Sequence, residues 1–254
     1  MLGAIFGDIV GSVYEFNPTN DYNFPLLNKQ SGYTDDTICT IAVADAYMNN
    51  KVYCDVLREW CGRYPHPMGG YGESFNRWLH SADCLPYYSW GNGSAMRVSS
   101  LGWLCRSETE VLSAATYSAA CTHNHPDGIR GAQSAALAVY LAHNGMDKAE
   151  LLQHIEHIFG YEIIGSNLDN YRCKFDESCN GTLPAAFLCI RDSHDYESAI
   201  RLAVSLGADA DTLGAIVGGI AEALYGMPEI YQKAVLDFLP TEMLRVYEQF
   251  KERV

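Results

Sequence analysis

The sequence has few signals for β-structure and few positive charges. No alternation of apolar and polar residues with period two runs beyond a few positions, and no Asn-Gly turn joins two β-branched runs. Helical spacings of three and four recur almost everywhere, so these absences exclude a sheet-based fold. The 17 basic residues are outnumbered by 31 acidic ones, which gives a formal net charge of -14. Such a chain repels phosphate backbones and anionic lipid, which argues against non-specific nucleic-acid binding and against a membrane partner.

The sequence also lacks a membrane span, a secretory signal and paired cysteines. No segment approaches the roughly 18 uninterrupted apolar residues that a span needs. The apolar start at Met1 has no basic residues before it and is interrupted by Asp8. The nine cysteines are odd in number and contain no Cys-x-x-Cys pair, a pattern unlike a disulfide framework or a zinc site. We therefore expect a cytoplasmic protein with free, mostly buried thiols.

The helical periodicity and the length of the chain predict a single all-α domain over residues 1–254. The chain can bury a large core, and no low-complexity linker divides it. Helices are expected at 35–49, 52–63, 72–80, 94–105, 148–159, 183–191, 196–206, 211–225 and 241–252, with others after the capping-box pattern at Ser107 and at Pro126. Residues 161–181 lack helical periodicity and predict a long surface loop.

Small residues recur every four positions near both ends of the chain. Gly3, Gly7 and Gly11 would stack on one face of a first helix that ends at Glu15, and Gly214 and Gly218 do much the same in the 211–225 helix. An interior glycine costs about 1 kcal/mol relative to alanine in a helix. Close backbone packing would offset that cost, so we expect both helices deep in the core and against each other.

Two acidic clusters stand directly before helical runs. They are Thr34-Asp35-Asp36-Thr37 and Asp209-Ala210-Asp211-Thr212. Capping alone can account for one such cluster, because Thr and Asp are preferred N-caps and acids complement the helix dipole. Two carboxylates at one helix start exceed what capping needs and repel each other unless a cation lies between them. Residue patterns alone leave capping and a metal site both open.

A converging pair of clusters would offer four carboxylates and two hydroxyls, with no His or Cys among them. All-oxygen ligation selects hard cations such as Mg²⁺ or Mn²⁺. Four negative charges balance two divalent ions, so a binuclear site is electrically reasonable and would act as a Lewis acid.

Three further motifs are candidates for the same site. The segment from Gly91 to Arg97 places small residues and an amide before a helical run, which suits close backbone approach to a phosphate. His123 lies at another expected helix start, where packing is the commoner role. Glu15 could face the same cavity as Asp8.

Taken in register, these residues resemble the ADP-ribosyl-hydrolase family over nearly the whole chain. The resemblance begins at Gly7-Asp8-Ile9-Val10-Gly11 with Glu15 and closes at Asp209-Ala210-Asp211-Thr212. It implies an all-α orthogonal helical bundle with a central binuclear metal site, holding two Mg²⁺ or Mn²⁺ ions. It implies a hydrolase that cuts the glycosidic bond between ADP-ribose and an arginine-type or serine-type side chain.

The resemblance also assigns roles to residues. The implied metal ligands are Thr34, Asp35, Asp36, Asp209, Asp211 and Thr212, and the implied substrate-binding residues are Gly70, Tyr71, Asn92, Gly93, Ser94 and His123. Glu15, Asp35 and Asp211 are the candidate catalytic residues, because carboxylates near the metals can stabilise an oxocarbenium-like state and handle a proton.

Two departures from the family pattern concern the substrate rather than the reaction. Ala208 stands where many relatives have a second glycine, and only 18 residues separate Glu15 from Thr34. We therefore expect the loops that choose the linkage to be trimmed or rebuilt relative to the family. Alternatives are a hydrolase of a small-molecule or nucleic-acid conjugate of ADP-ribose, a non-catalytic ADP-ribose-binding or structural relative, and an unrelated helical protein whose acid pairs only cap helices. Nothing in the sequence fixes the oligomeric state.

Overall fold

Thirteen α-helices and two 3₁₀ helices make up the structure, a computed structural model that describes residues 1–254. The α-helices are α1 (Leu2–Gly11), α2 (Asp35–Met48), α3 (Tyr53–Arg63), α4 (Glu73–Leu79), α5 (Ser99–Leu104), α6 (Glu108–Ala120), α7 (Pro126–His143), α8 (Lys148–Phe159), α9 (Cys179–Asp192), α10 (Tyr196–Ser205), α11 (Ala210–Tyr225), α12 (Glu229–Phe238) and α13 (Thr241–Lys251); the 3₁₀ helices are η1 (Asn92–Ser94) and η2 (Leu168–Tyr171). β-Pairing is confined to two isolated bridges. The all-α prediction is confirmed.

Helices α1 and α11 form the centre of the molecule and run antiparallel, with Gly3 against Gly218 and Gly7 against Gly214. A Cβ at Gly7 would lie 1.9 Å from the carbonyl oxygen of Gly214, and one at Gly218 would lie 2.1 Å from that of Gly3. Only glycine permits this approach. The predicted contact between the two glycine-rich helices is confirmed.

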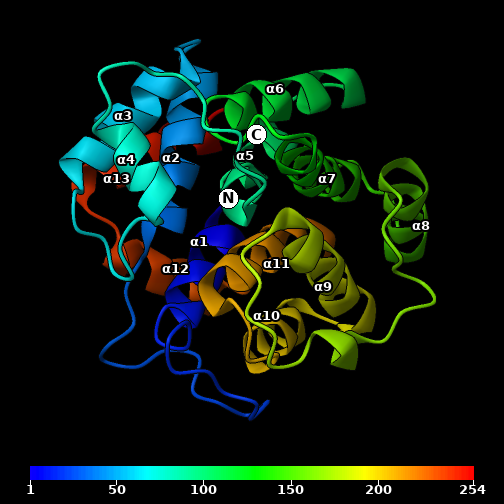
Figure 1. The fold of residues 1–254 in the computed structure, drawn as a ribbon. Coiled ribbons are helices and arrows are strands. Elements are labelled where there is room, and N and C mark those ends of the chain that lie inside the picture. Colours follow the sequence, from blue (N-terminus) through cyan, green and yellow to red (C-terminus); the bar gives the residue numbers. More distant parts are fainter.

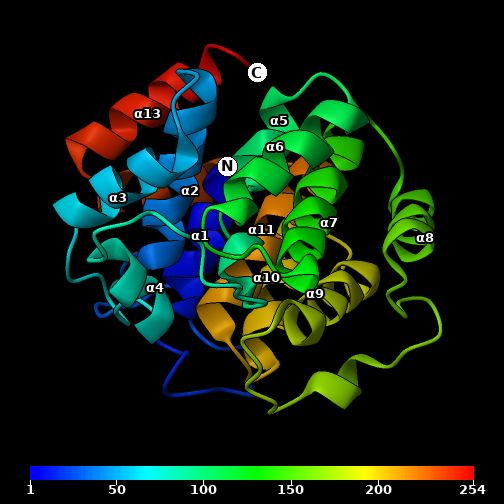
Figure 2. The same ribbon diagram turned by 45° about the horizontal axis from the view of Figure 1, so that its top comes forward.

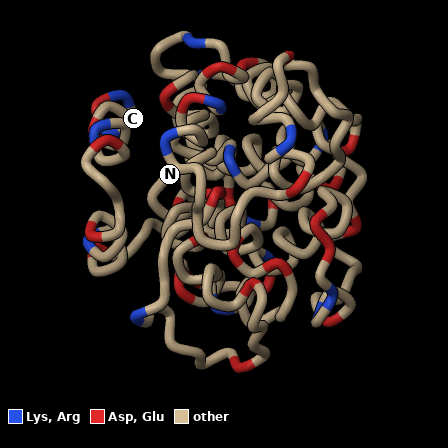
Figure 3. Tube along the Cα trace, turned by 60° about the vertical axis from the view of Figure 1, so that its left-hand side comes forward, with Lys and Arg blue, Asp and Glu red and all other residues tan.

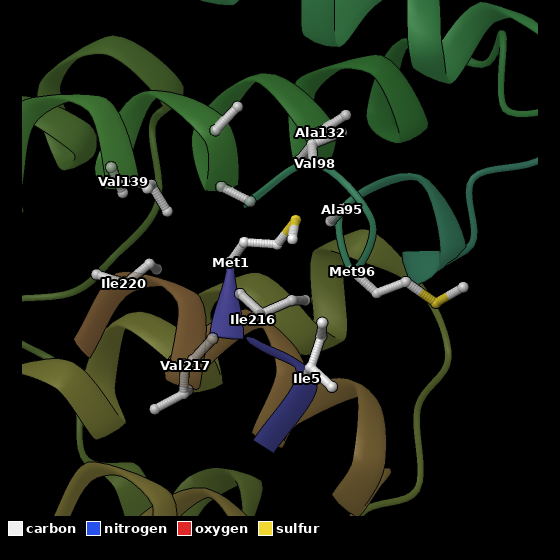
Figure 4. Close-up of a cluster of buried hydrophobic side chains, with 14 of the residues drawn as sticks. Met1, Ile5, Ala95, Met96, Val98, Ala132, Val139, Ile216, Val217 and Ile220 are labelled. Carbon is white, nitrogen blue, oxygen red and sulfur yellow. The ribbon is translucent and has the colours of Figure 1, made fainter. Parts of the chain in front are cut away.

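The other helices cover this pair on both sides (Figures 1 and 2). Helices α2, α3, α4 and α13 lie to one side, α7 and α9 lie to the other, and α8 is outermost. Figure 4 shows Met1 and Ile5 at the start of the chain packed among Ile216 and Ile220 of α11, together with Val98. All five are buried members of one hydrophobic core.

Several helices begin where the sequence predicts, at residues whose side chains accept bonds from the first turn. Ser107 accepts from Glu110 N, and Asp147 accepts from Ala149 N and Glu150 N. At Ser107 the reciprocal half of the predicted box is absent, because the carboxylate of Glu110 accepts from the backbone N–H of Arg106 instead. These bonds satisfy N–H groups that a helix cannot pair internally.

Four expectations about helix boundaries are wrong. The first helix ends at Gly11 rather than at Glu15, which lies beyond it in a turn. The expected 94–105 helix is η1 followed by the short α5, because Ser94 and Arg97 bond to other segments instead of continuing a helix.

The expected 161–181 loop contains η2, and α9 begins inside it at Cys179 rather than at 183. Ser178 accepts from Gly181 N and so starts the helix before Gly181 and Pro184. Helix α12 was not predicted from the sequence.

No helix combines the length and the apolar character that crossing a bilayer requires. All nine cysteines are free, and six of them are buried. Acidic positions outnumber basic ones along the trace and are spread over all of it (Figure 3).

Candidate active site

Asp8 on α1 is fully buried and organises the start of α2. Its carboxylate accepts hydrogen bonds from the backbone N–H and hydroxyl of Thr34, at 3.0 Å and 2.8 Å, and from the same two groups of Thr37. Thr34 also caps α2 by accepting from Asp36 N. Asp8 therefore fixes the first acidic cluster relative to the central helix pair. It does not line the cavity that Glu15 lines, contrary to the expectation that the two could share one.

The second acidic cluster opens α11 and converges on Glu15. One carboxylate oxygen from each of Glu15, Asp209 and Asp211 lies within 4.8 Å of the other two. Asp209 also accepts a hydrogen bond of 2.6 Å from the amide of Asn92. The Gly91–Arg97 segment and the second acidic cluster are thereby tied together, although more than a hundred residues separate them.

The carboxylates perturb one another because they are buried together. Burial raises the pKa of Asp8 to about 7, and the charge of Asp211 adds to the shift, although the bonds from Thr37 and Thr34 oppose it. Burial raises the pKa of Glu15 to about 8, with further contributions from Asp211, Asp8 and Glu177. Burial and the charge of Asp211 hold the pKa values of Asp35, Asp36 and Asp209 well above their usual range.

Two features of this cluster fit a hard divalent cation. One carboxylate oxygen of Asp36 is buried and has no hydrogen-bond partner, which is costly unless a ligand completes it. The charged groups that act most on the pKa of Asp36 are four other aspartates, and all of them raise it. An all-oxygen set of this kind selects Mg²⁺ or Mn²⁺ over softer metals.

The acidic cluster forms part of the wall of a cavity of about 440 Å³. Most of the predicted site residues line it: Glu15, Asp35, Asp36, Gly70, Tyr71, Asn92, Gly93, His123, Asp209, Asp211 and Thr212. They come from the turn after α1, the starts of α2 and α11, the segment before α4, η1 and the segment before α7. The structure thus brings together residues from six separate parts of the chain.

Two predicted site residues lie behind the cavity wall. Thr34 is fully buried and bonds to Asp8 and to the backbone of α2. Ser94 is fully buried, and its hydroxyl donates to the carbonyl of Gly128 at 2.7 Å. Both hold neighbouring segments in place, and Ser94 does not face the cavity.

His123 and Arg97 are two buried residues that also line the cavity. Burial and the nearby charge of Arg97 hold the pKa of His123 well below its usual range, so the imidazole is neutral. Its Nδ1 pairs with the hydroxyl of Thr122 at 2.7 Å. Arg97 is fully buried and donates to the carbonyl of Ser118 and the hydroxyl of Thr122.

Several lining residues were not singled out from the sequence. They include Phe16, Cys39, Tyr87 and Glu177. Phe16 is 73% exposed. None of them belongs to a motif with its own spacing; only proximity to motif residues, as for Phe16 beside Glu15, could have indicated them.

The fold and the cavity together define an all-helical protein whose acidic site is suited to cation-assisted hydrolysis. A search against family models matches ADP-ribosylglycohydrolase over residues 1–252. The chain therefore belongs to the ADP-ribosylglycohydrolase family. It is an ADP-ribosyl hydrolase of the glycohydrolase type, as the motifs predict.

Named relatives are similar along most of their length. The chain is 27% identical to ADP-ribosylhydrolase ARH3 of Mus musculus, in an alignment covering 96% of this chain and 88% of the relative. It is 27% identical to ADP-ribosylarginine hydrolase Tri1 of Pseudomonas putida, covering 89% and 70%. It is 26% identical to ADP-ribosyl-dinitrogen reductase glycohydrolase of Rhodospirillum rubrum, covering 90% and 85%.

A solved structure supports the same assignment. The chain matches an ADP-ribosylglycohydrolase-related protein complex with a TM-score of 0.70 and 25% sequence identity. The match covers 98% of this chain and 94% of that one. The family is metal-dependent, and the acidic cluster described above could hold metal.

Proposed function

We propose that residues 1–254 act as one domain that releases ADP-ribose from a modified protein side chain of arginine or serine type, with two divalent cations, Mg²⁺ or Mn²⁺. The observation that carries the proposal is the convergence of Glu15, Asp209 and Asp211 at an open cavity. Two relatives support a protein target, since one is named for ADP-ribosylarginine and another for dinitrogen reductase. The free cysteines favour a reducing compartment, the cytoplasm.

The residues proposed to hold the cations are Thr34, Asp35, Asp36, Asp209, Asp211 and Thr212. Of these six, Thr34 lies behind the cavity wall with its hydroxyl bonded to Asp8, so it would have to exchange that bond to reach a cation. When bound, the cations would supply positive charge for ribose hydroxyls and an activated water. Asp36 offers its unpaired oxygen for this purpose.

Hydrolysis adds the oxygen of water to the anomeric carbon and breaks its bond to the side-chain nitrogen or oxygen. One proton of the water ends on that leaving atom. Glu15 is the proposed group that accepts and returns this proton, because it is half-buried at the cavity and lies beside Asp211. Asp35 and Asp211 stabilise the positive charge that develops on the ribose.

The remaining proposed contacts position the ADP-ribose. Gly93 lies against the imidazole of His123, and a Cβ at this position would be only 3.2 Å from Nε2. Because glycine has no side chain, its backbone stays accessible from the cavity. Backbone N–H groups in such a segment suit a diphosphate. Gly70 and Tyr71 line the facing wall.

The test is release of ADP-ribose, measured by chromatography, from arginine-linked and serine-linked ADP-ribosyl peptides with Mg²⁺, Mn²⁺ or EDTA. Metal-dependent release that is lost in Asp35→Ala and Asp211→Ala is expected. Tight binding of ADP-ribose without release would identify a non-catalytic binding protein. Absence of both binding and release would refute the proposal.

A further inference from the structure

The cavity carries acidic groups beyond those proposed to hold cations. Glu177 lines it on the side where the chain enters α9, Glu15 lines it from the turn after α1, and Glu73 lines it at the start of α4. The only basic residue in the lining is Arg97, whose guanidinium is fully buried and donates to Ser118 and Thr122. Four aspartates balance two divalent ions, so the charges of Glu15 and Glu177 remain uncompensated when the site is loaded, whereas Glu73 has Arg77 beside it at 3.9 Å.

The main chain on either side of Glu177 is held in place. Its carbonyl accepts a hydrogen bond of 2.7 Å from the backbone N–H of Asn92, and the N–H of Cys179 donates to the carbonyl of Trp90 at 2.9 Å. The hydroxyl of Thr182 donates to the carbonyl of Asp176 at 3.0 Å. These bonds fix the segment against the Gly91–Gly93 loop, where the diphosphate is proposed to lie.

The carboxylate of Glu177 itself has neither a hydrogen bond nor a salt bridge within the chain, and its charge acts on Glu15 across the cavity. The backbone of Glu177 is therefore fixed while its carboxylate is free to accept hydrogen bonds. No bond within the protein has to break before this carboxylate binds a cationic group.

The two linkages differ in charge at the atom that leaves. A guanidinium joined to ribose stays positive near neutral pH and presents planar N–H donors that match a carboxylate, whereas an O-linked serine is neutral. We infer that Glu177 is a specificity-determining residue that pairs with the guanidinium of ADP-ribosylated arginine, so that arginine linkages are cleaved in preference to serine linkages. The inference rests on the proposed function, since it concerns the leaving group of that reaction.

The experiment compares kcat/KM for arginine-linked and serine-linked ADP-ribosyl peptides in the metal-loaded protein. Glu177→Gln keeps the shape and removes the charge, and Glu177→Asp keeps the charge on a shorter side chain. Glu162→Gln, an exposed acid outside the cavity lining, is the matched control for loss of one charge. Binding of free ADP-ribose is measured by calorimetry for each variant.

We expect the wild type to prefer the arginine peptide and Glu177→Gln to lower kcat/KM for that peptide by about tenfold, the low end for a charge-assisted bond because the side chain is exposed. Turnover of the serine peptide and affinity for ADP-ribose should stay near wild type, Glu177→Asp should restore part of the loss, and Glu162→Gln should match wild type.

Equal losses on both peptides in Glu177→Gln, or a wild type that prefers the serine peptide, would overturn the role of Glu177 while leaving the hydrolase function standing. Turnover of neither peptide by the wild type would instead overturn the proposed function, and the inference with it.

Discussion

Replacement of Gly7 by alanine tests whether the central helix pair depends on direct backbone contact. The added Cβ would lie 1.9 Å from Gly214 O and 2.3 Å from Gly214 C. Ordinary contact begins at 3.4 Å, so α1 and α11 must move apart by about 1.5 Å along that direction. The obstacle is backbone on a buried helix, which no side-chain rotation relieves.

The expected cost can be set against a known gain. Alanine improves helix propensity by about 1 kcal/mol relative to glycine. Forcing atoms into a packed core costs typically 1–3 kcal/mol and occasionally more. Because the intruding atom meets backbone, we expect the upper part of this range, and a net loss of about 2 kcal/mol in the free energy of unfolding of Gly7→Ala.

Urea denaturation measures the effect through a lower midpoint at unchanged m. Gly62→Ala in α3 is the matched control, because a Cβ there meets nothing within 4 Å; it should be neutral or stabilised by up to about 1 kcal/mol. A Gly7→Ala protein as stable as Gly62→Ala would refute the claim that close backbone packing explains the glycine spacing.

Two further predictions concern the acidic cluster. Asp36→Asn should weaken Mg²⁺ or Mn²⁺ binding by about tenfold or more, because it removes a buried carboxylate with an unpaired oxygen. The rise in melting temperature during a metal titration measures this, and a rise as large as in the wild type would contradict it. The second prediction is that the metal-free protein loses stability as pH rises from about 4 to 8. The folded state holds protons on Asp8 and Glu15, with pKa values of about 7 and 8, that the unfolded state releases near 4. Each group contributes a slope of at most about 1.4 kcal/mol per pH unit. Urea midpoints across this range test it, and Mg²⁺ should flatten the slope; rising stability in the metal-free protein would contradict it.

The helical class and the central pair were predictable because both leave periodic signals. Gly3, Gly7 and Gly11 fall on one helix face whatever the rest of the chain does, and their cost in helix propensity requires compensation by packing. Boundaries were less predictable where tertiary bonds decide them. Arg97 lies between η1 and α5 rather than in a helix, and its guanidinium donates to the carbonyl of Ser118; no local pattern in the sequence indicates that bond.

The residues of the site were likewise predictable only where they form a pattern in the sequence. The clusters at Asp35 and Asp211 repeat one pattern and so could be noticed, and the family resemblance ordered them into one site. Ser94 shares a motif with Asn92, yet only Asn92 faces the cavity, because the carbonyl of Gly128 takes the hydroxyl of Ser94. Glu177 belongs to no motif, and its place in the cavity follows from a backbone bond to Asn92.

The glycine contact and the acidic site are one arrangement. Asp8 directly follows Gly7, and Asp211 directly follows Ala210, whose carbonyl lies 2.3 Å from where a Cβ of Gly11 would be. Because α1 and α11 touch through backbone here, Asp211 is held close enough for its charge to raise the pKa of Asp8. A bulkier residue in place of Gly7 or Gly11 would separate the two acidic clusters as well as the two helices. We therefore expect Gly11→Ala to weaken divalent-cation binding more than Gly3→Ala does, because Gly3 lies at the far end of α1 from the carboxylates. Metal titrations and urea midpoints are measured on both variants. Together they show whether the loss of cation binding follows the distance from the site or only the loss of stability.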